Sequence, residues 1–285
     1  MLQTIKKNRI AQLVVIIFLV LTGWWISLQL SHHAADNNWF GVAYGSVALI
    51  GAIAGLVISR EWGGFKSNIG KAIIFFSLGL FAQEFGQVAY WFYVFVFHSE
   101  VPYPSIGDIG FFGSIPLYIL GAIQLSKASG LKLSLKSFSS KLQVILIPLI
   151  LLSVSYMIFL KDYVFDWHSP LTVLLDFGYP LGQAIYISIA ILAFLLSRRL
   201  LGGLMRPKIL LILFALVAQY ICDFTFLYQT SHGTWTANGV NDYMYLVSYL
   251  IMALAIINFD TLFKKLRGSP TPNPATPVPS ENEAA

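Results

Sequence analysis

The chain has 285 residues, of which 57% are hydrophobic and 11% are charged, and its net charge is +5. Because a soluble domain carries about 25% charged residues, this composition excludes an ordinary water-soluble protein and predicts an integral membrane protein in contact with the lipid bilayer. The positive residues flank apolar runs, where they meet anionic headgroups, so nucleic acid is not expected as a partner.

Eight long apolar runs follow one another along the chain. They cover approximately residues 10–30, 39–59, 70–97, 108–126, 142–160, 170–197, 208–230 and 243–263. Each run can cross a hydrocarbon layer about 30 Å thick as a helix. No small-residue cleavage site follows the first run, so we expect an uncleaved helix there and not a signal peptide. The predicted fold class is therefore all-α, a polytopic integral membrane bundle of eight transmembrane helices.

Lysine and arginine mark alternate gaps between these runs. Seventeen of the eighteen lie before the first run, between the second and third, the fourth and fifth, or the sixth and seventh runs, or after the eighth. Only Lys161 lies in one of the other gaps. Because positive residues are retained in the cytoplasm, the pattern predicts an N-in/C-in topology and a multi-pass protein of the cell membrane.

Short matches at a common offset of about 134–139 residues predict two similar four-helix units. The matching pairs are Ser59-Arg60 with Ser197-Arg198, Ala82-Gln83 with Ala218-Gln219, Gly107-Asp108 with Asn241-Asp242 and, after a gap, Ala43-Tyr44-Gly45 with Gly178-Tyr179-Pro180. Four helices per unit give both units the same orientation, a parallel 4+4 internal repeat within residues 1–267, with halves at about 1–135 and 136–267. The alternative is that apolar helices built from few residue types resemble one another.

Residues 268–285 contain five prolines together with Ser, Thr, Asn and Ala. Such a segment cannot bury enough apolar surface to fold, so we expect a disordered cytoplasmic tail. Either a docking segment or a plain solvated tail fits this composition.

Five carboxylates lie in the predicted outer half of the runs or at their outer ends. Glu84 is near the middle of the third run, Asp176 and Asp223 lie about two turns from the outer ends of the sixth and seventh, and Asp108 and Asp242 begin the fourth and eighth. Carboxylates are costly inside a bilayer and usually face the protein interior or a water-filled cavity, so they are candidate ligand-binding residues.

Two glutamines accompany these acids at helical spacing and complete the candidate site. Gln87 is three residues after Glu84, and Gln219 is four residues before Asp223. The alternative for all of these residues is structural: polar side chains can join transmembrane helices by hydrogen bonds, and an aspartate at a helix start can cap free amides.

Several chemistries are excluded or disfavoured by the sequence. All five histidines lie in the outer gaps without the i,i+4 spacing of a preformed helical metal site, so no metal is predicted. No apolar run contains a lysine away from its ends for retinal, or histidines for haem, so no cofactor is expected. HExxH, P-loop and nucleophile–base signatures are absent as well. We therefore do not expect an enzyme.

The stretch Pro102-Tyr103-Pro104-Ser105-Ile106-Gly107-Asp108, followed by Pro116 and Gly121, resembles a segment of bacterial polytopic sensor regions. Those regions precede GGDEF diguanylate cyclase, EAL phosphodiesterase or histidine kinase domains. Asp176-Phe177-Gly178-Tyr179-Pro180 is similar to the aromatic-Tyr-Pro helix in their second half. No output domain follows Lys265, so the resemblance implies a free-standing sensor that signals through a cytoplasmic partner.

These observations predict a non-enzymatic membrane sensor or ligand-binding module. Its outward-facing site, with acidic and aromatic residues, would bind an unknown small ligand or a proton and alter the packing of the two halves. The alternative is a secondary transporter or channel, because parallel repeats and carboxylates within the membrane also occur in such proteins.

Overall fold

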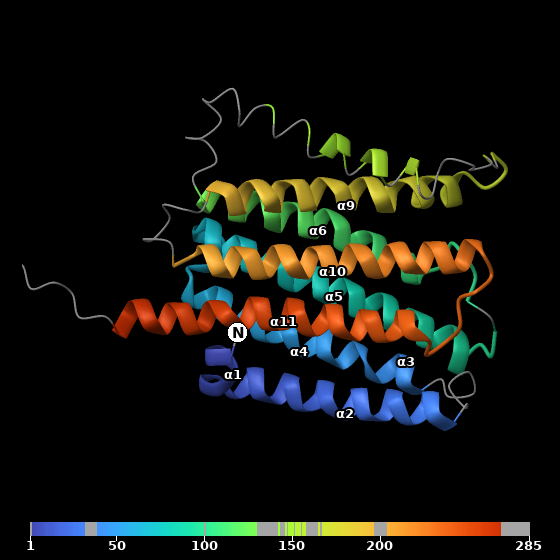
Figure 1. The fold of residues 1–285 in the computed structure, drawn as a ribbon, viewed down its shortest axis with the longest axis horizontal. Coiled ribbons are helices and arrows are strands. Elements are labelled where there is room, and N and C mark those ends of the chain that lie inside the picture. Colours follow the sequence, from blue (N-terminus) through green and yellow to red (C-terminus); the bar gives the residue numbers. More distant parts are fainter. Residues whose placement is uncertain are drawn as a thin grey trace, which may run out of the picture.

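The computed structural model describes residues 2–31, 39–99, 101–129, 165, 167–196 and 204–268, together with 142, 146, 148–150, 152–154, 156 and 157. Every regular element among these residues is helical (Figure 1). The elements are α1 (Leu2–Lys7), α2 (Arg9–Ser31), α3 (Trp39–Ala43), α4 (Gly45–Glu61), the 3-10 turn η1 (Gly64–Lys66), α5 (Asn68–Phe95), α6 (Gly107–Ala128), α9 (Pro170–Leu196), α10 (Arg206–Ser231) and α11 (Val240–Gly268).

In the part of the chain that the structure describes, seven helices are long and apolar enough to cross a membrane, α3 and α4 together forming one of them. They coincide with seven of the eight predicted runs, so the chain is all-helical with the helices of a multi-pass membrane protein. The fifth run, 142–160, lies largely outside the described residues. The predicted tail lies outside them from residue 269 onward.

The helices α4, α5, α6, α9, α10 and α11 form a closed ring. Each packs against the next, and α11 packs against α4. Buried tyrosines pack inside this ring: the rings of Tyr118 and Tyr186 lie edge to face at 5.8 Å, and the Tyr249 hydroxyl donates across to Gln83 Oε1 (3.2 Å). Outside the ring, α2 lies against α11 and α4 (Figure 1).

Two neighbouring pairs in the ring run in the same direction. Along α6 and α9, Asp108 meets Tyr179 and Tyr118 meets Tyr186, so the residue numbers rise together. Along α4 and α11, Tyr44 meets Asp242, and further along Trp62 packs against Phe259. The other neighbours in the ring are antiparallel (Figure 1).

Glycines allow α5 and α6 to approach closely. A Cβ at Gly79 would lie 2.2 Å from the Tyr118 ring. A Cβ at Gly110 would lie 2.4 Å from the carbonyl oxygen of Ala82 and 2.6 Å from the backbone nitrogen of Gly86. Inside a bilayer, helices associate through such close van der Waals packing of small residues. The motif at residues 102–108 leads into the start of α6, and this packing holds that part of α6 against α5.

Gly110→Ala is expected to lower the free energy of unfolding by about 1–3 kcal/mol, the usual cost of overpacking. The added methyl group meets backbone atoms, which cannot move aside as a flexible side chain would. Thermal unfolding of the purified protein in detergent measures the effect as a lower Tm.

The matched control is Gly113→Ala on the same helix, because a Cβ at Gly113 meets nothing within 4 Å. This variant should keep or raise Tm, since alanine is more favourable than glycine inside a helix by about 1 kcal/mol. Equal losses of Tm in both variants would contradict the close approach of α5 and α6.

Candidate functional site

A cavity of about 410 Å³ lies at one end of the bundle, where α6, α9 and α11 begin and α5 and α10 end. Two loops, over residues 101–105 and 235–238, complete its wall. We call this the cavity end, and we call the opposite end, where α1 lies beside the last turns of α11, the basic end. The cavity lining contains four carboxylates and eight aromatic residues: Asp108, Asp176, Asp223, Asp242, Tyr44, Tyr90, Tyr103, Phe111, Tyr179, Phe226, Trp235 and Tyr245. Among the described residues that line it, none is Lys, Arg or His.

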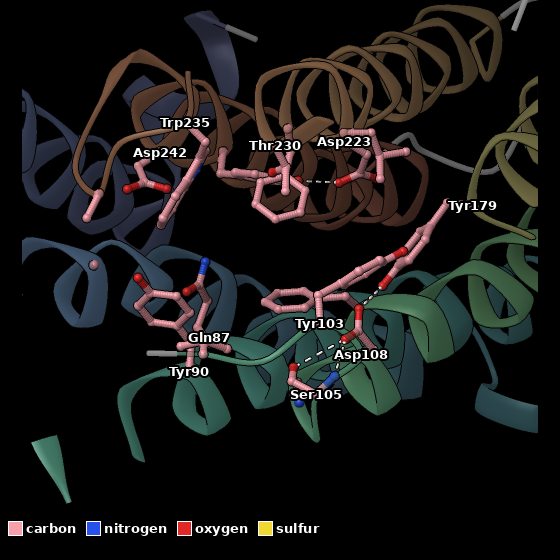
Figure 2. Close-up of a pocket in the computed structure, with 18 of the residues that line it drawn as sticks. Gln87, Tyr90, Tyr103, Ser105, Asp108, Tyr179, Asp223, Thr230, Trp235 and Asp242 are labelled. Carbon is pink, nitrogen blue, oxygen red and sulfur yellow. Dashed lines mark hydrogen bonds between the residues drawn. The ribbon is translucent and has the colours of Figure 1, made fainter. Parts of the chain in front are cut away.

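Asp108 joins the start of α6 to α9. Its Oδ2 accepts hydrogen bonds from the backbone N–H of Ser105 (2.7 Å) and from the Ser105 hydroxyl (3.2 Å). Its Oδ1 accepts a hydrogen bond from the Tyr179 hydroxyl (2.8 Å), as Figure 2 shows. The carboxylate thus orders the turn before α6 and also contacts a second helix.

Asp242 has the same arrangement at the start of α11. Its Oδ2 accepts from the backbone N–H of Asn238 (2.6 Å), and its Oδ1 accepts from the hydroxyl of Tyr44, the residue just before α4 (3.5 Å). The Tyr44 hydroxyl in turn accepts a hydrogen bond from Gln87 Nε2. Asp242, Tyr44 and Gln87 therefore form one polar chain across three helices on the cavity wall.

Asp223 is the acceptor of a network that joins α9, α10 and α11. Gln219 Nε2 donates to its Oδ1 (3.0 Å), the Tyr245 hydroxyl donates to the same oxygen (2.7 Å), and Gln183 Nε2 donates to Oδ2. Gln219 does not line the cavity. Its Oε1 accepts from the Ser248 hydroxyl (2.9 Å), so this glutamine positions Asp223 and anchors it to α11.

The two motifs that carry the resemblance meet at the cavity. Tyr103, in the loop before α6, donates a hydrogen bond from its hydroxyl to Asp176 Oδ1 on α9 (2.7 Å). Together with the bond between Tyr179 and Asp108, this contact places both motifs on one wall.

Glu84 does not line the cavity. Its side chain lies against α4, where a Cβ at Gly45 would be 2.1 Å from Glu84 Oε2. This buried oxygen has no hydrogen-bond partner among the described residues. Five of the seven predicted ligand-binding residues (Gln87, Asp108, Asp176, Asp223 and Asp242) line the cavity, whereas Gln219 contacts it only through Asp223. A ligand-binding role for any of them stays a prediction.

The sequence predicts aromatic residues at the site but does not identify Trp235 or Tyr245 as members. Trp235 lies in the loop between α10 and α11. Its ring makes an interplanar angle of 74° with Tyr90, at a centroid distance of 6.4 Å, and of 80° with Phe226, at 6.0 Å. A belt of aromatic residues at the membrane interface also accounts for tyrosine and tryptophan at helix ends. Two spacings point to the site: Gln183 is four residues after Tyr179, and Tyr245 is three after Asp242.

In the described part of the chain, neither the cysteine nor a metal-binding group lies at the cavity. The single cysteine, Cys222, is buried beside Asp223 and does not line the cavity. No group of three or more His, Cys, Asp and Glu side chains in the described part of the chain is placed to hold a metal ion. No protein-family model, curated protein or solved structure matches the chain.

Asp223→Ala should lower the free energy of unfolding by about 1–3 kcal/mol, because donors from Gln183, Gln219 and Tyr245 lose their acceptor. Tyr245→Phe removes one of these bonds and should cost only about 0.6 kcal/mol, the mean for such contacts in a membrane protein. Unfolding in mixed micelles compares the variants with wild type. An equal cost for both would show that Asp223 is not the shared acceptor.

Proposed function

We propose that the protein is a non-enzymatic membrane sensor or ligand-binding module. Its outward-facing cavity binds a small molecule or a proton, and the protein signals through a cytoplasmic partner. The observation that carries this proposal is the cavity itself, with carboxylates and aromatic rings contributed by helices that lie far apart in the sequence. A concave, mostly apolar site with a few fixed polar groups is typical of small-molecule binding.

The proposal includes eight transmembrane helices with both termini in the cytoplasm. Because α6 and α9 run in the same direction, the chain between residues 128 and 170 connects opposite ends of the bundle. This geometry supports a crossing by the fifth apolar run. The alternate distribution of Lys and Arg then places the cavity end outside the cell and the basic end in the cytoplasm.

Matching contacts support the 4+4 repeat. Asp108 pairs with Tyr179, and Asp242 pairs with Tyr44. Gln83 Nε2 donates to the Ser114 hydroxyl (2.8 Å), and Gln219 Oε1 accepts from the Ser248 hydroxyl (2.9 Å). The same 134 residues separate the two aspartates and the two serines. The cavity then lies where the halves meet, so a change in its occupancy can alter their packing.

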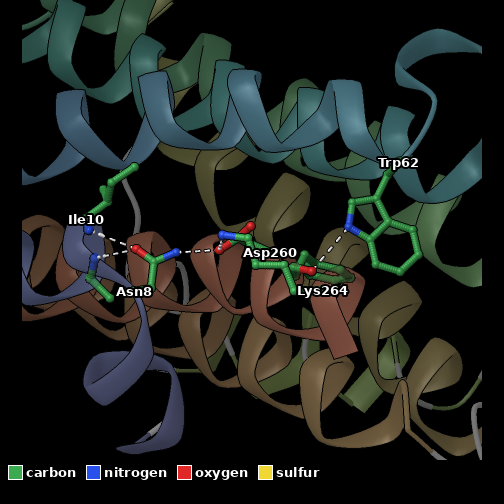
Figure 3. Close-up of polar contacts among 7 residues, drawn as sticks. Asn8, Ile10, Trp62, Asp260 and Lys264 are labelled. Atoms are coloured by element: carbon green, nitrogen blue, oxygen red, sulfur yellow. Dashed lines mark hydrogen bonds and ion pairs between the residues drawn. The ribbon is translucent and has the colours of Figure 1, made fainter. Parts of the chain in front are cut away.

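A polar cluster at the basic end supports a signalling role (Figure 3). Asn8 caps α2, since its Oδ1 accepts from the backbone N–H of Ile10 (2.8 Å), while its Nδ2 donates to Asp260 Oδ2 (2.6 Å). Lys264 donates to the same Asp260 oxygen (2.9 Å), and Trp62 Nε1 donates to the Phe259 carbonyl (3.3 Å). This cluster therefore ties α2 and the end of α4 to α11.

Two further bonds attach α1 and α10 to the same part of α11. The Thr4 hydroxyl and Lys208 Nζ both donate to Asn258 Oδ1, each at 2.6 Å. Because α11 also carries Asp242 and Tyr245, one helix connects the cavity wall with the proposed cytoplasmic surface. A small shift of α11 would be transmitted to α1.

The second candidate function is a secondary transporter or channel. The observation that favours it is the position of the cavity between the proposed halves, where transporters with repeats place their substrate. Transport requires the site to open at the basic end as well, which the cluster around Asn258 and Asp260 opposes in this conformation.

The proposed topology predicts which introduced cysteines are accessible from outside the cell. In a Cys222→Ser background, an impermeant maleimide added to intact cells should label Lys161→Cys and leave Lys136→Cys unlabelled. His232→Cys is the matched outer control and Lys66→Cys the inner control, since both native residues are exposed. Labelling of positions 136 and 161 from the same side would contradict a crossing by the fifth run.

Cavity binding is tested by thermal shift of the protein in nanodiscs against organic cations, organic acids, quinones and divalent metals. At least one class should raise the Tm of wild type, because a ligand at 100 times its Kd stabilises by about 2.7 kcal/mol. Thr230→Trp, which fills the cavity, should abolish the shift. Phe214→Trp, on the same helix but exposed and away from the cavity, should retain it. No shift in wild type, or an equal shift in Thr230→Trp, would refute the binding proposal.

A sensor and a transporter differ in what binding does next. For a sensor, the stabilising compound should change amide hydrogen exchange in residues 2–8, which contact α11 at the basic end. For a transporter, proteoliposomes should accumulate the compound. Accumulation without any change in exchange would favour the second candidate.

A further inference from the structure

The cavity has a net negative lining. Four carboxylates face it, and no cationic side chain does so among the described residues. A carboxylate has about four acceptor positions. Asp242 receives two hydrogen bonds, from Asn238 and Tyr44, and so retains positions for an occupant. Electrostatic complementarity therefore favours a positively charged occupant over a neutral or anionic one.

Aromatic rings surround the region in front of Asp242. Figure 2 places Asp242 and Trp235 on one wall and Tyr90 and Gln87 on the opposite wall. The planes of the Trp235 ring and the Tyr90 ring are inclined at 74°, and those of Trp235 and Phe226 at 80°, so Trp235 packs edge to face with both rings. The faces of such rings attract ammonium groups, and quaternary ammonium ligands are often recognised by aromatic residues.

The rest of the lining argues for an organic cation and not a bare ion. Phe111, Leu227 and Val101 present apolar surface to the same cavity. The volume of about 410 Å³ lies within the range of small-molecule sites. A metal ion would need several ligands converging on one point, and no such group is found among the described residues.

We propose that the cavity binds a small organic cation, an amine or quaternary ammonium compound with an apolar or aromatic body. Its charged head would lie between Asp242, Trp235 and Tyr90, and its body would lie toward Phe111. This inference rests on the proposed function of the cavity as an outward-facing ligand site.

The test measures binding by isothermal titration calorimetry to the full chain in nanodiscs. The probes are 2-phenylethylammonium, phenyltrimethylammonium and choline. The neutral comparison is 2-phenylethanol and the anionic comparison is phenylacetate. At least one ammonium probe should bind at least about tenfold more tightly than the alcohol, since its charge meets both the carboxylate and the rings. Phenylacetate should not bind.

Three variants locate the site. Trp235→Leu should weaken binding of the ammonium probe about tenfold, and Trp235→Phe should restore most of the affinity because it keeps an aromatic face. Trp167→Leu, at an exposed tryptophan outside the cavity, should bind like wild type. Asp242→Asn should also weaken binding while keeping an acceptor for Tyr44.

Other outcomes overturn the inference. Equal binding of 2-phenylethanol, or preference for phenylacetate, would show that charge does not select the ligand. Unchanged binding to Trp235→Leu and to the filled cavity of Thr230→Trp would place the cation elsewhere. If no ammonium probe binds but another class gives a cavity-dependent thermal shift, the cation inference fails and the proposed function stands. If no class gives such a shift, both fail.

Discussion

Hydrocarbon offers no hydrogen-bond partner, so the buried polar groups of this bundle depend on other parts of the protein for hydrogen bonds. This constraint explains the pairs at the cavity end. The carboxylates of Asp108 and Asp242 each accept a backbone N–H from the preceding turn and a tyrosine hydroxyl from a neighbouring helix. The same bonds set the register of α6 against α9 and of α11 against α4. The cavity lies between these fixed walls.

The positions of the helices are predictable from sequence because the length of an apolar run sets the length of a membrane helix. The run predicted at 170–197 corresponds to α9, Pro170–Leu196, and the run at 208–230 corresponds to α10, Arg206–Ser231. The order of helices around the ring is not predictable in this way. Closure of α11 against α4 depends on side-chain packing, such as Ala253 against Gly51, between residues without a sequence signal.

For the site, the sequence predicts that two aspartates lie at the same end of the bundle, but it does not predict which residues they contact. Asp108 and Asp242 both begin runs of the same predicted direction, so their common location follows. Tyr44 is 198 residues from Asp242. The repeat matches Tyr44 with Tyr179, but this match does not identify which aspartate either tyrosine contacts. Glu84 is predicted at the site but lies outside it. Helical spacing groups it with Gln87, but its side chain packs against Gly45. The packing of neighbouring helices sets the rotation of α5 about its axis, and the sequence does not indicate that rotation.

The distribution of polar groups along α11 bears on the choice between sensing and transport. Asp242, Tyr245 and Ser248 lie in its first turns, and Asn258 and Asp260 lie near its end. Residues 250–257 between them are all apolar and all buried. A polar solute following α11 would therefore lose its hydrogen bonds over about two turns of helix, at a cost of several kcal/mol for each unpaired group. A rigid displacement of the helix moves no polar solute through this stretch and so avoids that cost. This contrast favours transmission of a conformational change along α11 over passage of the ligand beside it.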